Sequence, residues 1–183
     1  ADLTVPRETE EMIQTIYERF GEIDVLINVV GPFFRRNILD ISPAQFKEVI
    51  ELNLMTAYNT THYSLNKIRK PGGHIIYFGF AGVENIKDWS NSPGFCIAKT
   101  GILVLAKSLA ATLAADKIRV NCVCPGIIKQ QKETADRKEV AEKVPWGRYG
   151  SPVEIAETVS WLVRESPDYI TGSSVNVSGA WEY

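Results

Sequence analysis

Short apolar runs alternate along this chain with longer segments in which apolar residues recur at helical spacing. In the first long segment, Pro6 to Phe20, the apolar side chains share one helical face, and Gly21 ends the pattern. The run from Asp24 to Gly31 is short and closes on glycine, which predicts a strand buried on both faces. Ser42 and Pro43 are residue types that open a helix. The whole pattern predicts helices over 6–20, 42–70 (with one irregularity), 97–115 and 153–163, and strands over 24–31, 74–78, 118–124 and 174–177.

The order of these elements predicts the fold class. Strands that alternate with helices of this length are typical of parallel βαβ units. We therefore expect an α/β fold, a Rossmann-like doubly wound parallel sheet, in one domain over 1–183. A chain of 183 residues with 45% apolar residues can bury one substantial core. The long polar insertion 129–146 is either a lid over a ligand crevice or an ordinary solvated loop.

Charge and hydropathy argue against two classes of partner. The chain has 20 basic and 22 acidic residues and no sustained basic stripe, so we expect no nucleic acid partner. The longest apolar stretches, such as 97–105, are interrupted by Lys99 and Gly101, so we expect no membrane span. The N-terminus shows no basic-then-apolar signal. A soluble cytoplasmic protein is the expectation.

Cysteine and histidine are scarce in this sequence. The three cysteines are too few for a disulfide framework, and Cys122 and Cys124 are predicted to lie at alternate positions of one strand. With two histidines in the chain, we expect no metal site. The four tryptophans are predicted to be core and interface residues rather than a stacking platform.

Five short motifs stand in order at the ends of the predicted strands or on the predicted helices. They are 28–31 (Asn-Val-Val-Gly), 52–54 (Leu-Asn-Leu), 95–99 (Phe-Cys-Ile-Ala-Lys), 119–126 (ending Pro-Gly) and the tail motifs within 150–179. In this order and on these elements they resemble the motifs of the short-chain dehydrogenase/reductase family. The resemblance spans almost the whole chain.

The resemblance implies an NAD or NADP cofactor and hydride transfer to a small-molecule carbonyl, such as a 3-oxoacyl group. Among its cofactor positions, Asp2 would meet the adenine and Lys99 the ribose. The catalytic positions that it implies are Asn53, Phe80, Phe95 and Lys99. The cofactor positions that it implies are Asp2, Asn28, Gly31, Lys99, Pro125, Gly126 and Ile128.

The sequence departs from the family pattern at two catalytic positions. Phe95 stands where the family has the tyrosine that acts as general acid, and Phe80 stands where it has the serine that orients the carbonyl. A phenyl ring can neither donate a proton nor hydrogen-bond an alkoxide. The family also opens with a strand, a glycine-rich turn and a helix that hold the pyrophosphate, and we expect this chain to lack them. Cofactor binding and activity are therefore both in doubt.

Three interpretations follow. The chain is part of an oxidoreductase that uses another acid, or a catalytically inactive subunit or regulator, or a truncation product of a longer reductase. The second predicts a homo-oligomer formed through the helices 42–70 and 97–115, as in the family. The third predicts poor solubility, because the strand over 25–29 would expose an unpaired edge.

Overall fold

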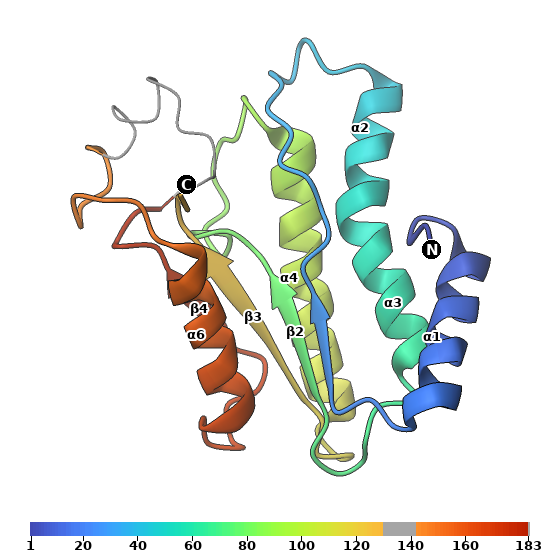
Figure 1. Cartoon of the computed structure of the whole chain (residues 1–183). Helices are drawn as coiled ribbons and strands as arrows, with labels where there is room; N and C mark the ends of the chain where they lie inside the picture. The colour runs from blue at the N-terminus through green and yellow to red at the C-terminus, as the bar shows by residue number, and fades with distance from the viewer. Residues whose placement is uncertain (130–141, 183) are drawn as a thin grey trace.

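The computed structural model describes residues 1–129 and 142–182, and it has the predicted alternation of helices and parallel strands (Figure 1). Most of the predicted lid, 129–146, lies outside the described residues. The elements are α1 (Pro6–Phe20), β1 (Val25–Asn28), α2 (Pro43–Ile50), the π-helix η1 (Glu51–Met55), α3 (Thr56–Ser64), β2 (His74–Phe78), α4 (Pro93–Leu113), β3 (Arg119–Pro125), α6 (Pro152–Arg164) and β4 (Ser174–Val177).

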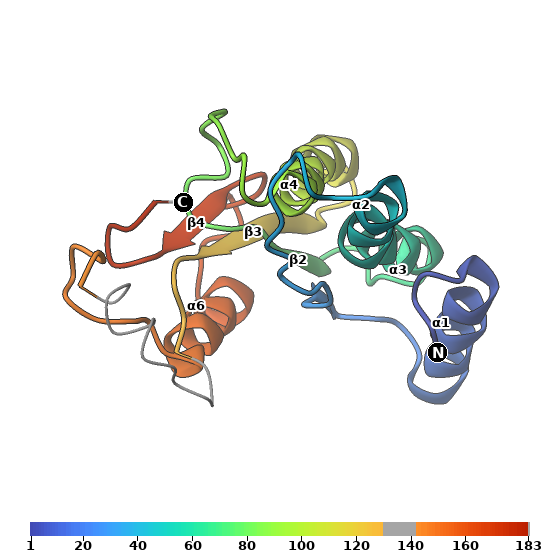
Figure 2. The same ribbon diagram turned by 90° about the horizontal axis from the view of Figure 1, so that it is seen from above.

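The four strands form one parallel sheet in the order β1-β2-β3-β4. Helices cover both faces: α4 and the α2–α3 segment pack on one, and α6 packs on the other (Figure 2). Two clusters of buried side chains correspond to these faces, a large one under α4 and a smaller one around Leu162 of α6. The α/β fold with a parallel sheet is thus confirmed.

β1 is an edge strand of this sheet, which corrects one prediction. It was expected to be buried on both faces, but Ile27 is 44% exposed and Val29, just beyond the strand, is 63% exposed. The reason is that β1 pairs with β2 on one side only among the described residues. An apolar groove of about 700 Å³, lined by Val25, Ile27, Ile155 and Val159 among others, runs between this edge and α6.

The predicted helix over 42–70 ends earlier than expected. Ser42 caps α2 in a reciprocal capping box with Gln45, and the predicted irregularity is the π-helix η1. The helix then ends at Ser64 rather than at Lys70. Ile68 forms a bridge with Ile23 and its side chain is buried, so a tertiary contact stops the helix before the glycine turn does.

α4 extends from Pro93 to Leu113 and is the central helix of the large cluster. It has the length and hydropathy of a membrane-spanning helix, with 21 residues and a mean hydropathy of 1.5. Lys99 and Gly101 interrupt the apolar run 97–105 but not the helix, which contains both, as the predicted helix 97–115 did. One side of α4 packs against β2 and β3, which is typical of the core helix of a folded domain.

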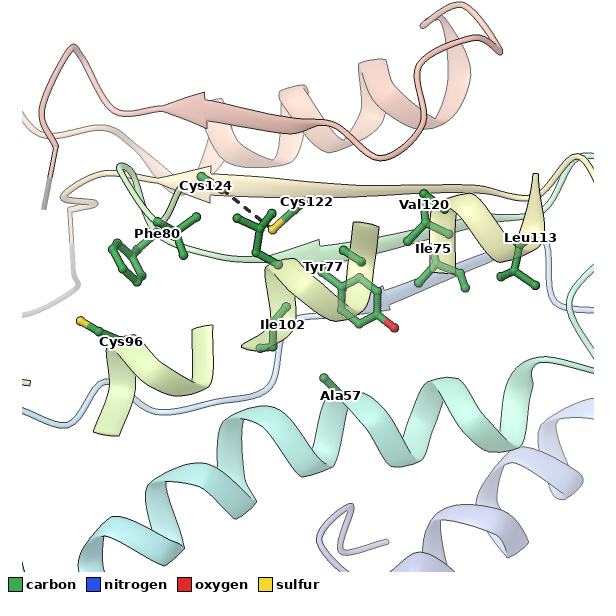
Figure 3. Close-up of a cluster of buried hydrophobic side chains, with 14 of the residues drawn as sticks. Ala57, Ile75, Tyr77, Phe80, Cys96, Ile102, Leu113, Val120, Cys122 and Cys124 are labelled. Atoms are coloured by element: carbon green, nitrogen blue, oxygen red, sulfur yellow. Dashed lines mark hydrogen bonds between the residues drawn. The ribbon is translucent and has the colours of Figure 1, made fainter. Parts of the chain in front are cut away.

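The three cysteines are free and fully buried. Cys122 and Cys124 lie at alternate positions of β3, as predicted, with their Sγ atoms 3.9 Å apart (Figure 3). Gly79 passes directly over them, since a Cβ there would lie 3.0 Å from the Cys124 sulfur. Cys96 lies on α4 in the same cluster.

One polar pair is buried between the central strands. Asn121 of β3 donates from Nδ2 to His74 Nε2 at 3.0 Å, which leaves the imidazole proton on Nδ1. His74 Nδ1 is itself buried and has no partner among the described residues. Burial, with a smaller contribution from Arg119, lowers the pKa of His74 to about 4.

We predict that His74 makes folding stability fall with acidification. Its pKa is below that of the unfolded chain, so the unfolded state takes up a proton first and stability is lost from pH 6.5 down to about 4. Between pH 7 and pH 5 the expected loss is about 2 kcal/mol. Urea unfolding at both pH values measures it. Between pH 7 and pH 5 the free energy of unfolding of the His74→Gln variant should fall by about 2 kcal/mol less than that of the unaltered chain. An equal fall in both proteins would show that His74 is not the cause.

Candidate functional site

The candidate site lies where β1, β2 and β3 end, because the carboxyl ends of parallel strands meet at one edge of the sheet. The chain beyond β2 stays bonded to β3, with Gly79 N donating to Val123 O and Ala81 N to Pro125 O, both at 2.9 Å. These two bonds fix Phe80 between them. The first turns of α4 bring Phe95 and Lys99 to the same edge, one helical turn apart.

Aromatic side chains fill this edge. Phe80 and Phe95 are buried, with ring centres 6.0 Å apart. Phe33 packs its ring edge on Phe95 at 4.9 Å, and Trp89 packs on Phe80 at 5.6 Å. Phe80, labelled in Figure 3, and Phe95 both belong to the large cluster, so the hydrophobic core continues into the site. A hollow of about 360 Å³ remains, lined by Phe33, Gly79, Phe80, Phe95, Pro125, Gly126, Ile127, Ile128, Lys129 and Trp181.

Lys99 lies beneath this aromatic layer. Its side chain is 5% exposed, and its Nζ lies 5.8 Å from the centre of the Phe95 ring. Desolvation lowers the pKa of the amine to about 8, against a smaller opposing effect of the nearby thiols. Lys99 does not line the hollow. The amine is therefore covered by Phe95 rather than presented to a ligand there.

Asn53 and Gly31 are locked together. Asn53 is fully buried in η1, and its Nδ2 donates to the carbonyls of Val49 (3.1 Å) and Pro32 (3.2 Å). Its Oδ1 has no partner among the described residues. A Cβ at Gly31 would lie 2.3 Å from this oxygen, so only glycine fits. Asn53 thus bridges the irregular helix η1 directly to the backbone beyond β1.

Three further predicted cofactor residues, Asn28, Asp2 and Gly126, are also engaged in internal contacts. Asn28 accepts a hydrogen bond from Thr60 through Oδ1 and leaves Nδ2 buried and without a partner among the described residues. Asp2 lies in the turn before α1, where its Oδ1 accepts from the backbone N (2.9 Å) and hydroxyl (2.7 Å) of Thr4. These bonds lower the pKa of Asp2. Gly126 packs on the backbone of Ser178, 2.7 Å from where a Cβ would lie.

A nicotinamide cofactor fits this arrangement only in part. The segment from Pro125 to Ile128 lines a mostly apolar hollow that would accept the flat face of a nicotinamide ring. The backbone N–H of Gly126 is already bonded to Val177, however, and the Lys99 amine, which would meet the ribose, is covered. These two donors are therefore not available to hold the cofactor. In the described ranges, no group of three or more His, Cys, Asp or Glu side chains could hold a metal ion.

Sequence reasoning missed Phe33 and Trp181 as residues of the site. Phe33 follows the end of β1 by a few residues, and loops after strand ends are where such sheets bind ligands, which is the signal that could have found it. Trp181 comes from the far end of the chain and carries no comparable signal. The prediction that the tryptophans are core and interface residues was incomplete, because Trp181 lines the hollow.

Comparison with known proteins gives a consistent set of relatives. A family model described as enoyl-(acyl carrier protein) reductase matches residues 1–181. Nodulation protein G of Azospirillum brasilense is 32% identical over 177 residues, covering 94% of this chain and 71% of that protein. The 3-oxoacyl-[acyl-carrier-protein] reductase FabG of Salmonella typhimurium is 30% identical over 183 residues, 97% of this chain and 74% of FabG. A solved structure of a blue fluorescent protein from a metagenomic library, in complex with NADPH, matches 98% of this chain and 73% of its own with a TM-score of 0.88 at 24% identity.

Proposed function

This chain belongs to the short-chain dehydrogenase/reductase family of NAD(P)-dependent oxidoreductases, and from that premise we propose that its own site does not catalyse hydride transfer. One observation carries the proposal. Phe80 and Phe95, which the resemblance assigns to the serine and tyrosine positions of the family, pack against each other as phenyl rings inside the core.

The chemistry of carbonyl reduction explains why this matters. When a hydride adds to the carbonyl carbon, the oxygen becomes an alkoxide and must receive a proton from an acid in contact with it. Neither phenyl ring has a proton to give. Loss of a positioned general acid typically costs about 10²–10⁴-fold in rate. Lys99 does not replace it, because its amine lies under Phe95 and does not line the hollow.

The cofactor and the substrate class are part of the same proposal. FabG is named as a 3-oxoacyl reductase and the metagenomic protein was solved with NADPH, which supports NAD(P) and a carbonyl substrate for active relatives. For this chain we infer weak cofactor binding at most, because Lys99 is covered and the Gly126 N–H is already bonded to Val177. The three free cysteines suit a reducing compartment such as the cytoplasm.

A structural role is the second candidate, favoured by the surface of two helices. Ile97 and Val104 of α4 are 50% and 60% exposed, and Met55 and Tyr58 on the η1–α3 segment are 38% and 45% exposed. Exposed apolar side chains on neighbouring helices support self-association through the helices expected in the sequence, 42–70 and 97–115. Sedimentation of the chain, compared with a Val104→Glu variant, tests this role.

The activity test uses the unaltered chain and the F80S/F95Y variant. Each is given NADH or NADPH with a 3-oxoacyl thioester, an aldehyde and a ketone, and oxidation of the nicotinamide is followed by absorbance. We expect no turnover above the blank from the unaltered chain, and calorimetry reports cofactor binding separately. Turnover by the unaltered chain would overturn the proposal. A gain in the variant alone would show that the missing hydroxyl groups are the cause.

A further inference from the structure

The aromatic hollow has a polar neighbour that the family chemistry does not explain. A second hollow, of about 390 Å³, lies on the other side of Phe33 and Trp181, which line both. Phe33 is 55% exposed, so its ring stands at the opening between them. The second hollow is lined by Phe33, Arg35, Asp88, Trp89, Ser90, Asn91, Ser92, Lys143 and Trp181.

The charges of the second hollow favour an anion. Arg35 and Lys143 contribute two positive charges, and neither has an ion pair among the described residues. Asp88 contributes the one negative charge of this lining, and its Oδ1 already accepts from the backbone N of Ser90 at 2.8 Å. The side-chain amide of Asn91 adds a neutral donor. A carboxylate placed here would meet two cations and displace no partner that either has within 1–129 and 142–182.

We propose that the two hollows together bind a small amphipathic carboxylate, with its ring or other flat apolar part against Phe33 and Phe95 and its anionic group at Arg35 and Lys143. This inference rests on the proposed function, because a pocket that lacks a catalytic general acid can bind a ligand without converting it. The apolar part gains the edge and face contacts that aromatic rings prefer. The carboxylate gains charge-assisted hydrogen bonds, and Arg35 can offer two in parallel.

The same charges exclude the usual ligand of an aromatic pocket. Aromatic side chains also attract quaternary ammonium groups, but a cation would be repelled by Arg35 and Lys143 at this opening. A neutral ring compound would fill the aromatic hollow and leave the polar one to water. The order of affinity expected from the structure is therefore acid, then neutral amide, then amine.

Three probes with one carbon skeleton test this order: 3-phenylpropanoate, 3-phenylpropanamide and 3-phenylpropylamine. Binding is followed by calorimetry and by tryptophan fluorescence, which reports on Trp89 and Trp181 at the site. We expect the acid to bind about tenfold more tightly than the amide. R35A/K143A should remove that advantage and leave amide binding unchanged, while F33A should weaken both. R7A, which removes an exposed cation elsewhere, is the matched control.

Equal affinities for acid and amide, or an unchanged acid affinity in R35A/K143A, would overturn the inference. Arg35, Lys143 and Phe33 are exposed, so these substitutions should leave the fold intact, and circular dichroism checks this. The result is distinct from that of the activity test. Turnover by the unaltered chain would overturn the proposed function but would not change the ratio of the affinities for the acid and the amide. Equal affinities for the two probes would overturn this inference but would not create turnover.

Discussion

Replacement of Gly31 by alanine is expected to lower the free energy of unfolding by about 3 kcal/mol. The new Cβ would lie 2.3 Å from Asn53 Oδ1 and 2.9 Å from its Cγ. Asn53 cannot move away, because it is fully buried and its amide nitrogen bonds to two backbone carbonyls. The backbone at Gly31 also has a φ of 143°, which alanine adopts only with strain. Urea unfolding measures the loss.

Gly72→Ala is the matched control for this substitution. Gly72 has a φ of 105°, but a Cβ there would meet nothing within 4 Å. That variant reports the backbone strain alone, about 1 kcal/mol. If G31A were no more destabilising than G72A, the close contact between the new Cβ and Asn53 would make no contribution to the loss of stability. Asn53 was expected among the catalytic residues, and this pair of variants measures instead how firmly it is held.

Replacement of Arg119 by methionine should lower the free energy of unfolding by a similar amount, about 3 kcal/mol, because it removes several part-buried hydrogen bonds to the end of α6. The guanidinium donates to Leu162 O (3.0 Å) and Val163 O (3.2 Å) at the end of α6. It also donates to Ser166 Oγ at 2.9 Å. The side chain is 12% exposed, so water replaces few of these bonds. Arg119 thereby joins the last turn of α6 to β3 through hydrogen bonds.

Two comparisons separate this effect from a loss of surface charge. Arg119→Lys keeps the charge but not the planar set of donors, and should recover only part of the stability. Arg7→Met removes an exposed i,i+4 ion pair with Glu11 and should change stability by less than about 0.5 kcal/mol. Similar losses for R119M and R7M would mean that the bonds to α6 contribute nothing. Thermal and urea unfolding of the three variants provide the comparison.

Two strands could be predicted from the sequence to the residue. His74–Phe78 in the middle of the sheet and Ser174–Val177 at its edge have the bounds expected from apolar runs set between turn residues. The ends of the helices were harder. α4 begins at Pro93 rather than at Ile97, although proline at the first helical position is a known start signal. The helix before β2 stops where Ile68 pairs with Ile23, and a contact so distant in sequence leaves no local trace.

The site likewise has features that the sequence predicts and features that it does not. The family resemblance is confirmed, and Phe80, Phe95 and Gly126 do line one hollow at the carboxyl ends of the strands. The contacts made by these residues depend on neighbours from distant segments. The i, i+4 spacing of Phe95 and Lys99 places them on one face of α4, but nothing in the local sequence indicates that Phe33 covers Phe95. Their roles in binding or catalysis remain predictions for the variants above.

The three buried thiols have a practical consequence. Cys96, Cys122 and Cys124 expose no surface in the folded chain, and burial raises the pKa of Cys96 to about 11. An alkylating reagent therefore reacts with these sulfurs only in molecules that have opened. The sulfurs lie on the central helix and a central strand, so the opening that exposes them disrupts most of the core. The rate at which alkylated cysteines accumulate, measured by mass spectrometry, therefore reports how often the core of this chain opens.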